Sequence, residues 1–389
     1  MKQVKLKPLA ASILSLSLLT VMAGAAVAPA LEVIRAHFAD AGMTAIQLIV
    51  SMPAIFIVIT NLCFGRLAGK FGAKTLVMAG LVLYTVGGCC AGLFDSIAMI
   101  LVMRSLVGIG VGIIMPLSTG LLTYYFPPEK REGLMGLSSA ANQLGGVAAT
   151  LLAGVLAGIS WRMSFMVYLM GLISIVLCLI FMPNDRIRSA DSSSGSGTGG
   201  GVLRRNFRYI AAMFLLMSSF FIYPANFAIV TAAEGAIPMS LCAPVMAGCD
   251  LVAFLGGLLF VKVKKASGRF AALVAPVLFL GGYCLLAFVG GRAGVLTGSA
   301  LIGFANGVGI PYIISTASAG EGKRAATTVM PLISAAMYLA QFVSPFLLSA
   351  VTAIAGDAVR LPYYLAAVLS ALLIACSIPD TLSPVAKNA

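Results

Sequence analysis

Stretches of about 20 consecutive apolar residues recur along the whole of this chain, and they restrict its fold more than any other feature. The hydrocarbon core of a bilayer is about 30 Å thick, which a helix crosses in about 20 residues. Backbone N–H and C=O groups find no water there, so only helices and closed barrels can span it. The stretches lack the alternation of apolar and polar residues that barrel strands need. The chain is therefore predicted to be an all-α, polytopic membrane protein.

Breaks rich in charged or turn-forming residues divide these stretches into twelve predicted transmembrane helices. They cover residues 9–31, 45–65, 75–94, 97–123, 133–157, 161–183, 209–231, 236–261, 271–290, 294–317, 326–352 and 360–379. Only 10% of the 389 residues are charged and 60% are hydrophobic, whereas soluble domains carry about 25% charged residues. A soluble fold could not bury that much apolar surface, so a lipid bilayer is the expected surrounding.

The net charge of +13 follows the predicted topology rather than indicating a nucleic-acid partner. Of the 25 cations, 20 lie on the side that holds both termini. They are Lys2, Lys5, Lys7, Arg66, Lys70, Lys74, Lys130, Arg131, Arg186, Arg188, Arg204, Arg205, Arg208, Lys262, Lys264, Lys265, Arg269, Lys323, Arg324 and Lys387. Because Lys and Arg accumulate in cytoplasmic loops, both termini are predicted to lie in the cytoplasm and the chain in the cell membrane.

The first seven residues are rich in Lys, and the small-residue run GAAVAPA follows an apolar stretch, as in a secretory signal peptide. Cleavage there would leave eleven spans and would start the mature chain outside the cell. We therefore expect this segment to remain as the first span.

An internal repeat divides the chain. A Gly- and Ser-rich segment, residues 184–208, separates a predicted six-helix bundle at 1–183 from a second at 209–389 and is expected to be a cytoplasmic linker. An offset of 195 residues places LVGIGVGIIMP of the fourth span over LIGFANGVGIP of the tenth, and the same offset carries the fifth span onto the eleventh. Two parallel six-helix repeats are the arrangement in which a substrate binds near the membrane midplane at the repeat interface and access alternates by rocking.

The loop after the second predicted span has the sequence GRLAGKFGAK. It resembles the cytoplasmic loop motif of the major facilitator superfamily, in particular of its proton-coupled drug and metabolite exporters. Gly69 stands where the family usually has an Asp that helps to lock the outward-facing state, and Ala73 stands where it usually has a cation. The resemblance therefore implies a gating loop with a weakened lock. Its residues are Gly65, Arg66, Lys70, Gly72 and Lys74.

The resemblance extends over the whole chain. In the fourth span Arg104 is followed by Gly108 and Gly112, as in the family's second motif, where the buried Arg is tied to proton coupling. In the fifth span Ala149 and Thr150 stand where the family's antiporters typically have Gly-Pro. The resemblance thus implies a transporter but leaves the direction of transport open.

Two ionisable side chains lie clearly within predicted spans, where charge is costly and commonly functional. Asp250 is about halfway along the eighth span, and because carboxyl groups held away from water bind protons more readily, we predict that it carries a coupled proton. Arg104 is predicted to tune proton release, with Glu32 at the outer end of the first span as its candidate counter-ion. The alternatives are a structural Asp, a structural Arg bonded to carbonyls, and a plain interfacial Glu.

Uncharged polar side chains in four spans are predicted to line a substrate cavity. They are Asn142, Gln143, Tyr223, Asn226, Asn306, Tyr312, Tyr338 and Gln341. For each of them the alternative is a bond to a neighbouring helix. The spans contain no catalytic cluster, the cysteines have no metal-ligand spacing, and no phosphate-binding loop occurs, so we expect neither an enzyme, a metal site nor ATP-driven transport.

These features favour a secondary transporter that works by alternating access, by hypothesis a proton-coupled exporter of small organic or amphipathic compounds. The scarcity of buried charge argues against a highly charged substrate. An uptake permease for a small metabolite, by symport or facilitated diffusion, is the alternative within transport, and a non-transporting membrane sensor is the alternative from another class. We expect a functional monomer that uses no cofactor and draws on a proton gradient.

Overall fold

The computed structural model describes residues 6–183, 199–289, 291–319 and 325–382. Within them, eleven helical stretches are long and apolar enough to cross a membrane. One of these, Met239–Val289, has 51 residues and contains two successive helices, α10 (Met239–Ser267) and α11 (Ala271–Cys284). The described part of the chain therefore carries twelve spans, and the predicted all-α polytopic fold is confirmed.

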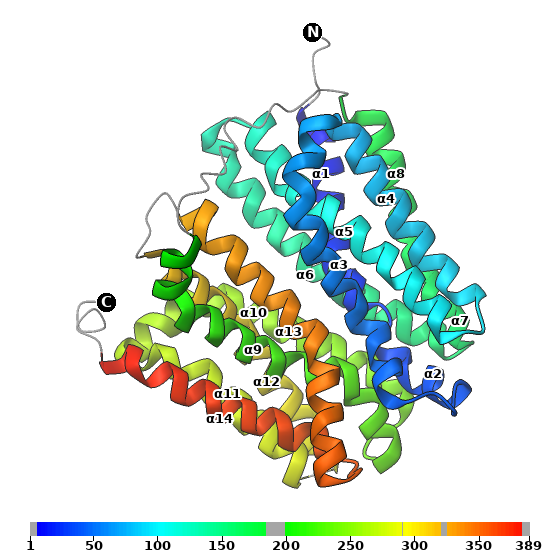
Figure 1. The fold of residues 1–389 in the computed structure, drawn as a ribbon, viewed down its shortest axis with the longest axis vertical. Coiled ribbons are helices and arrows are strands. Elements are labelled where there is room, and N and C mark those ends of the chain that lie inside the picture. The colour runs from blue at the N-terminus through cyan, green and yellow to red at the C-terminus, as the bar shows by residue number, and fades with distance from the viewer. Residues whose placement is uncertain (1–5, 184–198, 290, 320–324, 383–389) are drawn as a thin grey trace. The chain divides into compact units, whose positions relative to one another are not determined.

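The chain forms two compact units, Met1–Ser194 (unit 1) and Gly195–Ala389 (unit 2). Unit 1 contains α1 (Leu6–Ala25), η1 (Ala28–Ala30), α2 (Leu31–His37), α3 (Met43–Lys70), α4 (Ala73–Cys90), η2 (Ala91–Leu93), α5 (Ile97–Tyr125), α6 (Pro128–Ala157), α7 (Trp161–Ser164), η3 (Phe165–Leu169) and α8 (Met170–Phe181) (Figure 1). Unit 2 contains α9 (Gly199–Glu234), α10, η4 (Gly268–Phe270), α11, η5 (Leu285–Val289), α12 (Gly291–Ala319), α13 (Ala325–Ala355) and α14 (Leu361–Leu382).

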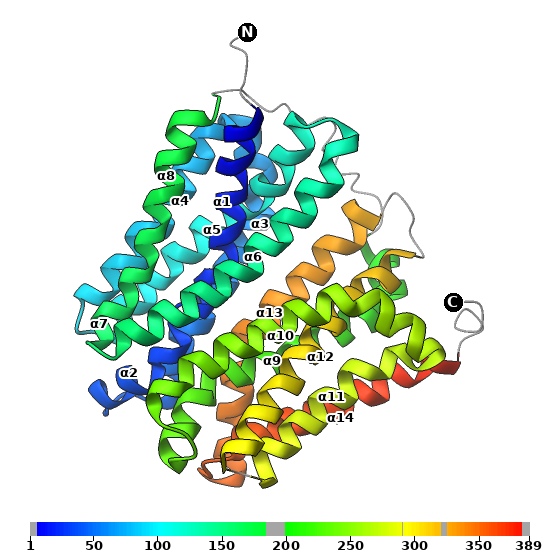
Figure 2. The ribbon, with the colours of Figure 1, turned by 180° about the vertical axis from the view of Figure 1, so that it is seen from behind.

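Helix packing repeats from one unit to the other. In unit 1, α3 and α4 both pack on α5, α1 packs on α6, and α8 packs on α1 and α4. In unit 2, α10 and α11 both pack on α12, α9 packs on α13, and α14 packs on α9 and α11 (Figure 2). The same pairing of the first to sixth span thus occurs twice, as expected for two copies of one six-helix fold.

Three spans that the sequence predicts as single helices are interrupted. The first changes at Pro29, which has no N–H to donate and lies in the 3-10 turn η1. The sixth begins with the short α7, where the Ser160 hydroxyl accepts from the Arg162 N–H, and continues through the 3-10 segment η3 into α8. The ninth ends in the wider π-helical turn η5. Such irregular backbone is tolerated at membrane depth where protein covers it, and η1 is fully buried.

The predicted linker is shorter than expected. Helix α9 begins at Gly199, so residues 199–208 are helical, and residues 184–198 lie outside the described part of the chain. Arg208, predicted to be a linker residue, forms an ion pair with Asp380 near the end of α14, and the Tyr209 hydroxyl bonds the same carboxylate at 3.5 Å. These contacts stabilise the extra turns of α9. Seven cations of the predicted topology lie outside the described residues: Lys2, Lys5, Arg186, Arg188, Lys323, Arg324 and Lys387.

Candidate functional site

Unit 2 contains a small group of polar side chains, which we call the Asp250 cluster: Asp250, Tyr223 and Ser299. Asp250 lies in α10, is half-buried, and interacts electrostatically with Tyr223 of α9. The buried Tyr223 hydroxyl donates a hydrogen bond of 2.8 Å to the Ser299 hydroxyl of α12. Three spans of unit 2 therefore bring a carboxyl, a phenol and an aliphatic hydroxyl into one neighbourhood.

Close packing of α12 against α10 holds the helix that carries Asp250. A Cβ atom at Gly303 would lie 2.2 Å from the Cys249 carbonyl oxygen, and one at Gly307 would lie 2.0 Å from the Ala253 carbonyl oxygen. Only glycine allows such contact between two backbones. Because Cys249 and Ala253 flank Asp250 along α10, the backbone on both sides of the carboxyl-bearing residue is fixed against α12.

Unit 1 contains a different arrangement, which we call the Arg104 hub: Arg104, Ile49, Ala23 and Tyr168. Arg104 lies in α5 and is completely buried. Its Nε donates to the Ile49 carbonyl of α3 at 2.6 Å, and its two terminal nitrogens donate to the Tyr168 hydroxyl of η3 and to the Ala23 carbonyl of α1. The Tyr168 hydroxyl in turn donates to the Ala23 carbonyl at 2.9 Å. The Arg104 guanidinium thus links α5, to which it belongs, to α3, η3 and α1 through hydrogen bonds to uncharged oxygen atoms.

Glu32, the predicted counter-ion of Arg104, is engaged elsewhere. Its carboxylate accepts bonds of 2.8 and 2.9 Å from Arg35, one turn along α2. The hydrogen bonds of Arg104 described above all end on carbonyl or hydroxyl oxygens. The structure therefore brings Glu32 to Arg35 rather than to Arg104, because the i, i+3 spacing places the two side chains of α2 next to each other.

The predicted cavity residues differ in their surroundings. The Asn142 amide oxygen accepts a bond of 2.7 Å from Thr20 of α1, the Asn226 amide donates to the Ile222 carbonyl of its own helix at 2.9 Å, and Tyr223 belongs to the Asp250 cluster. The Asn306 amide oxygen of α12 is buried without a hydrogen-bond partner among the described residues. Gln341 is buried. The half-buried members are Gln143, Tyr312 and Tyr338.

The predicted gating loop is largely helical. Helix α3 runs through Gly65, Arg66 and Lys70, and α4 begins after Gly72, so two residues alone separate the helices. Arg66 and Lys70 are exposed. The Lys74 ammonium donates a bond of 2.7 Å to the Leu179 carbonyl near the end of α8. This residue thus satisfies a terminal carbonyl of another helix, within unit 1.

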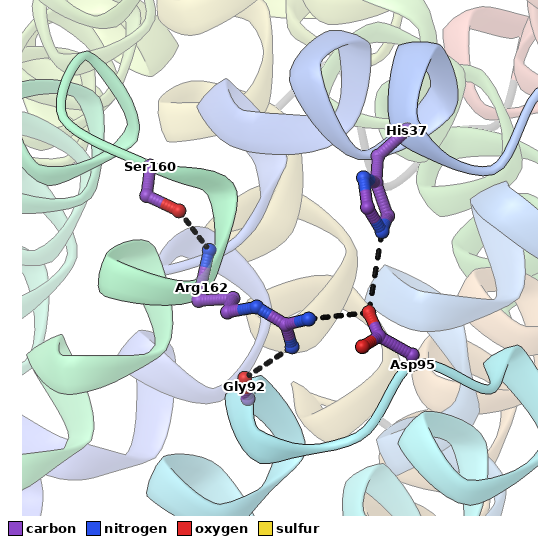
Figure 3. A network of polar contacts seen from close by, with 5 residues as sticks. All are labelled: His37, Gly92, Asp95, Ser160 and Arg162. Carbon is purple, nitrogen blue, oxygen red and sulfur yellow. Dashed lines mark hydrogen bonds and ion pairs between the residues drawn. The ribbon is translucent and has the colours of Figure 1, made fainter.

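A polar cluster that the sequence did not reveal joins three connections of unit 1 (Figure 3). We call it the His37 cluster: His37, Asp95, Arg162 and Trp161. The Asp95 carboxylate accepts bonds from Arg162 at 2.5 Å and from His37 at 3.2 Å, and Arg162 also donates to the Gly92 carbonyl at 3.1 Å. The His37 ring lies 5.0 Å from the Trp161 ring. His37 is exposed, yet segments far apart in the chain meet around it.

Sequence reasoning also missed Tyr168 and Ser299. Ser299 stands 195 residues after Arg104, so the repeat offset itself marks it as the counterpart of a buried functional group. Nothing in the local sequence singles out Tyr168, since its partner carbonyl belongs to α1 and is reached only in the folded unit. In the described residues, no group of His, Cys, Asp and Glu is arranged to hold a metal ion.

Two six-helix units with the same packing, each burying a polar group among its spans, define a twelve-span helical membrane protein of the two-repeat class. Comparison with known families agrees with this architecture. The chain belongs to the Major Facilitator Superfamily, whose family model matches residues 13–345. It is therefore a multi-pass membrane protein of a transporter family.

The curated relatives include drug-resistance proteins and transporters of metabolites. Multidrug resistance protein 3 of Bacillus subtilis is 29% identical over 103 residues, which are 26% of this chain and 20% of the relative. The hexuronate transporter of the same organism is 25% identical over 189 residues, which are 47% of this chain and 44% of the relative. The chain thus spans less than half the length of these relatives, and their names alone do not define its substrate or direction.

Among solved structures, a bacterial homologue of the human lysosomal transporter Spinster, in an inward-facing and occupied conformation, superimposes with a TM-score of 0.77. The match covers 99% of this chain and 98% of the other at 15% sequence identity. At that identity the similarity establishes the fold.

Proposed function

We propose that this transporter is proton-coupled and exports small organic or amphipathic compounds, with Asp250 as the residue that binds and releases the proton. Both termini then lie in the cytoplasm, the protein works as a monomer in the cell membrane, and the proton gradient supplies the energy. In this proposal Arg104 tunes proton release, the predicted polar residues of the fifth, seventh, tenth and eleventh spans contact the substrate, and the gating loop from Gly65 to Lys74 controls opening to the cytoplasm.

The placement of Asp250 is the observation that carries the proposal. It is a half-buried carboxyl in the middle of a membrane span, and it interacts electrostatically with the buried Tyr223 phenol. A negative charge inside a membrane is costly, and a carboxylate that takes up a proton loses that charge. Asp250 therefore has a physical reason to alternate between charged and neutral forms as its exposure changes.

Polar groups near this carboxyl suit an uncharged or weakly charged substrate. The Asn306 amide oxygen lies buried in α12 without a partner among the described residues, and α12 also carries Ser299 of the Asp250 cluster. A buried acceptor without a partner costs free energy until a ligand or water donates to it. A substrate with a hydroxyl, amine or amide donor would supply that bond.

The test is transport by the purified protein in proteoliposomes with a pH-sensitive dye inside. A panel of lipophilic dyes, drugs and small neutral or singly charged metabolites is added, and lumenal pH is followed. Substrate-dependent proton movement opposite to the substrate supports export by antiport, and movement in the same direction supports the uptake permease, as the similarity to the hexuronate transporter would suggest.

The variant that tests Asp250 is Asp250→Asn, with Asp40→Asn, an exposed loop carboxyl, as the matched control. Asp250→Asn is expected to abolish gradient-driven transport and to leave substrate exchange at equal pH partly intact, while Asp40→Asn behaves as the wild type. Unchanged gradient-driven transport by Asp250→Asn would show that Asp250 is structural.

A further inference from the structure

The three acceptors of Arg104 are not equivalent. The Ile49 and Ala23 acceptors are backbone carbonyls, which the helices fix in place, whereas the Tyr168 acceptor is a side-chain hydroxyl. This hydroxyl accepts from Arg104 and donates to Ala23, so both of its hydrogen-bonding roles are used within the hub. It is the one acceptor of the three that a substitution can remove without altering the backbone.

The ring of Tyr168 is held from α4. A Cβ atom at Gly88 would lie 2.1 Å from the Tyr168 Cγ, so the absence of a side chain at Gly88 provides the space for the ring. One turn earlier, the Tyr84 ring meets the Tyr168 ring edge-on, with centroids 5.2 Å apart. The Tyr84 hydroxyl is buried and has no hydrogen-bond partner among the described residues. Two neighbouring tyrosines thus share their packing, but only one of them bonds to Arg104.

The position of Tyr168 in the fold connects Arg104 to two interrupted spans. Tyr168 lies in η3, the 3-10 segment where the sixth span changes helix type, and Ala23 lies in the last turn of α1, before the first span breaks. Short 3-10 segments within helices commonly mark places where a helix can change shape. A movement of the Arg104 side chain would therefore be transmitted through the Tyr168 hydroxyl to the interruptions of both the first and the sixth span.

We propose that Tyr168 is a positioning residue for transport, whose hydroxyl fixes the Arg104 guanidinium against α1 and links it to the break in the sixth span. This inference rests on the role of Arg104 in the proposed function and extends it to a residue that touches neither proton nor substrate. Arg104 then acts in one fixed orientation, so loss of the hydroxyl alters where its charge is held without removing that charge.

The experiment compares Tyr168→Phe with Tyr84→Phe in proteoliposomes. Both variants lose one buried hydroxyl and keep the ring, so they differ in whether a bond to Arg104 is lost. Tyr168→Phe is expected to slow transport about 3- to 20-fold, the range for one hydrogen bond between membrane helices, and to shift its pH profile, with KM within about twofold of wild type. Tyr84→Phe is expected to match the wild type in both rate and pH profile.

A double-mutant cycle tests whether Tyr168 acts through Arg104. In an Arg104→Gln background, Tyr168→Phe is expected to add less than about a twofold further change, because the bond is already lost. Equal effects of Tyr168→Phe and Tyr84→Phe, or a full additional effect in the Arg104→Gln background, would overturn the proposal. Should Tyr168→Phe fail to fold, 4-fluorophenylalanine at this position fills the space of the hydroxyl but donates no bond and accepts only weakly, and a shift of the pH profile in the same direction is expected.

Failure of the proposed function is distinguishable from failure of this inference. If the wild type moves substrate without moving protons, the proton-coupled mechanism is wrong. The cycle is therefore run on substrate exchange at equal pH on both sides, which needs no coupling, over a series of pH values. Non-additive effects of Arg104→Gln and Tyr168→Phe on this exchange support the inference, and additive effects contradict it.

Discussion

The two units place different chemistry at the same position of the repeat. Arg104 of α5 and Ser299 of α12 are 195 residues apart, the offset at which the fourth and tenth spans align. In unit 1 this position holds a fully buried cation that bonds three other elements, and in unit 2 it holds a hydroxyl that accepts one bond from Tyr223. A single packing scheme therefore accommodates either a charged hub or a neutral hydrogen bond.

A second pair of sites shows how a carbonyl of the first helix is bonded by a tyrosine in each unit. The carbonyl of Ala23 in α1 accepts from Tyr168 of the sixth span, and the carbonyl of Ser219 in α9 accepts from Tyr283 of the third span of unit 2. Tyr283 stands 195 residues after Gly88, the glycine that makes room for the Tyr168 ring. The tyrosine lies on a different helix in each unit, but a carbonyl of the first helix of the unit is bonded in both.

The largest expected effect concerns the glycines that let the second and fourth spans of each unit touch. In unit 2 a Cβ at Gly307 would lie 2.0 Å from a backbone oxygen, whereas in unit 1 a Cβ at the equivalent Gly112 would lie 2.6 Å from the Thr60 side chain. Because the contact at Gly307 is the shorter of the two, Gly307→Ala should cost about 2–3 kcal/mol of unfolding free energy and Gly112→Ala about 1–2 kcal/mol. Unfolding in detergent micelles by a denaturant series measures both.

The matched control for these glycines is Gly257→Ala in α10. Its Cβ would meet its nearest neighbour, the Gly307 carbonyl oxygen, at an ordinary 3.7 Å. We expect this variant to be as stable as the wild type or slightly more stable, since alanine favours a helix over glycine. If Gly307→Ala is no less stable than Gly257→Ala, the close contact of α10 and α12 does not hold Asp250 in place.

The next effect contrasts the two residues at the repeated position. Arg104→Lys keeps the charge but offers a single ammonium to acceptors on three elements, so it should lower stability by about 2 kcal/mol. Ser299→Ala removes one neutral bond between helices and should cost about 0.6 kcal/mol. Thermal unfolding followed by circular dichroism in the same detergent ranks the two. Equal losses of stability would mean that Arg104 contributes no more than an ordinary hydrogen bond between two helices.

Much of the fold could be predicted from the sequence because membrane helices are encoded locally. Twenty apolar residues in a row give a span whatever the rest of the chain does, and the Lys and Arg distribution then gives a topology. The interruptions in the first and sixth spans could not be predicted in this way. They depend on whether protein covers the irregular backbone, as it covers Pro29 and Phe165, and that is known only after the helices pack.

The candidate site was predictable to a lesser degree. Asp250 and Arg104 stood out because charge within an apolar stretch needs a reason, and each lies inside a helix as expected. The partners of these side chains were harder to predict. Glu32 pairs with Arg35 of its own helix, and the hydroxyl that binds Arg104 comes from Tyr168, 64 residues further along the chain. Apolar spans contain many tyrosines, and only the packing of the sixth span against α4 and α1 selects this one.

A smaller effect compares the arginines that begin the sixth span of each unit. Arg162 bonds the Gly92 carbonyl and an Asp95 side chain that is 63% exposed, whereas Arg360 bonds the Ala287 carbonyl and a Glu234 side chain that is only 18% exposed. Water screens the first pair more strongly. Arg360→Ala should therefore cost about 1 kcal/mol of unfolding free energy and Arg162→Ala less than about 0.5 kcal/mol. The reverse order would mean that the His37 cluster contributes more than its ion pair alone.

The smallest effect is a local response of the His37 cluster to acid. Hydrogen bonds from Arg162 and then His37 lower the pKa of Asp95 below its ordinary value of 3.8. A carboxyl whose pKa is depressed in the folded state contributes to stability above the pKa that it has in the unfolded state. It loses that contribution as pH falls through its folded-state pKa, so the cluster should loosen only below about pH 4.

Trp161 is the sole tryptophan of the chain, and its ring lies 4.6 Å from the Arg162 guanidinium carbon, so its fluorescence reports the change. Titration from pH 7 to pH 3 should alter the emission of the wild type below pH 4 and leave Asp95→Asn unchanged there. A change that begins well above pH 4, or one that persists in Asp95→Asn, would show that Asp95 is not the group that the fluorescence follows.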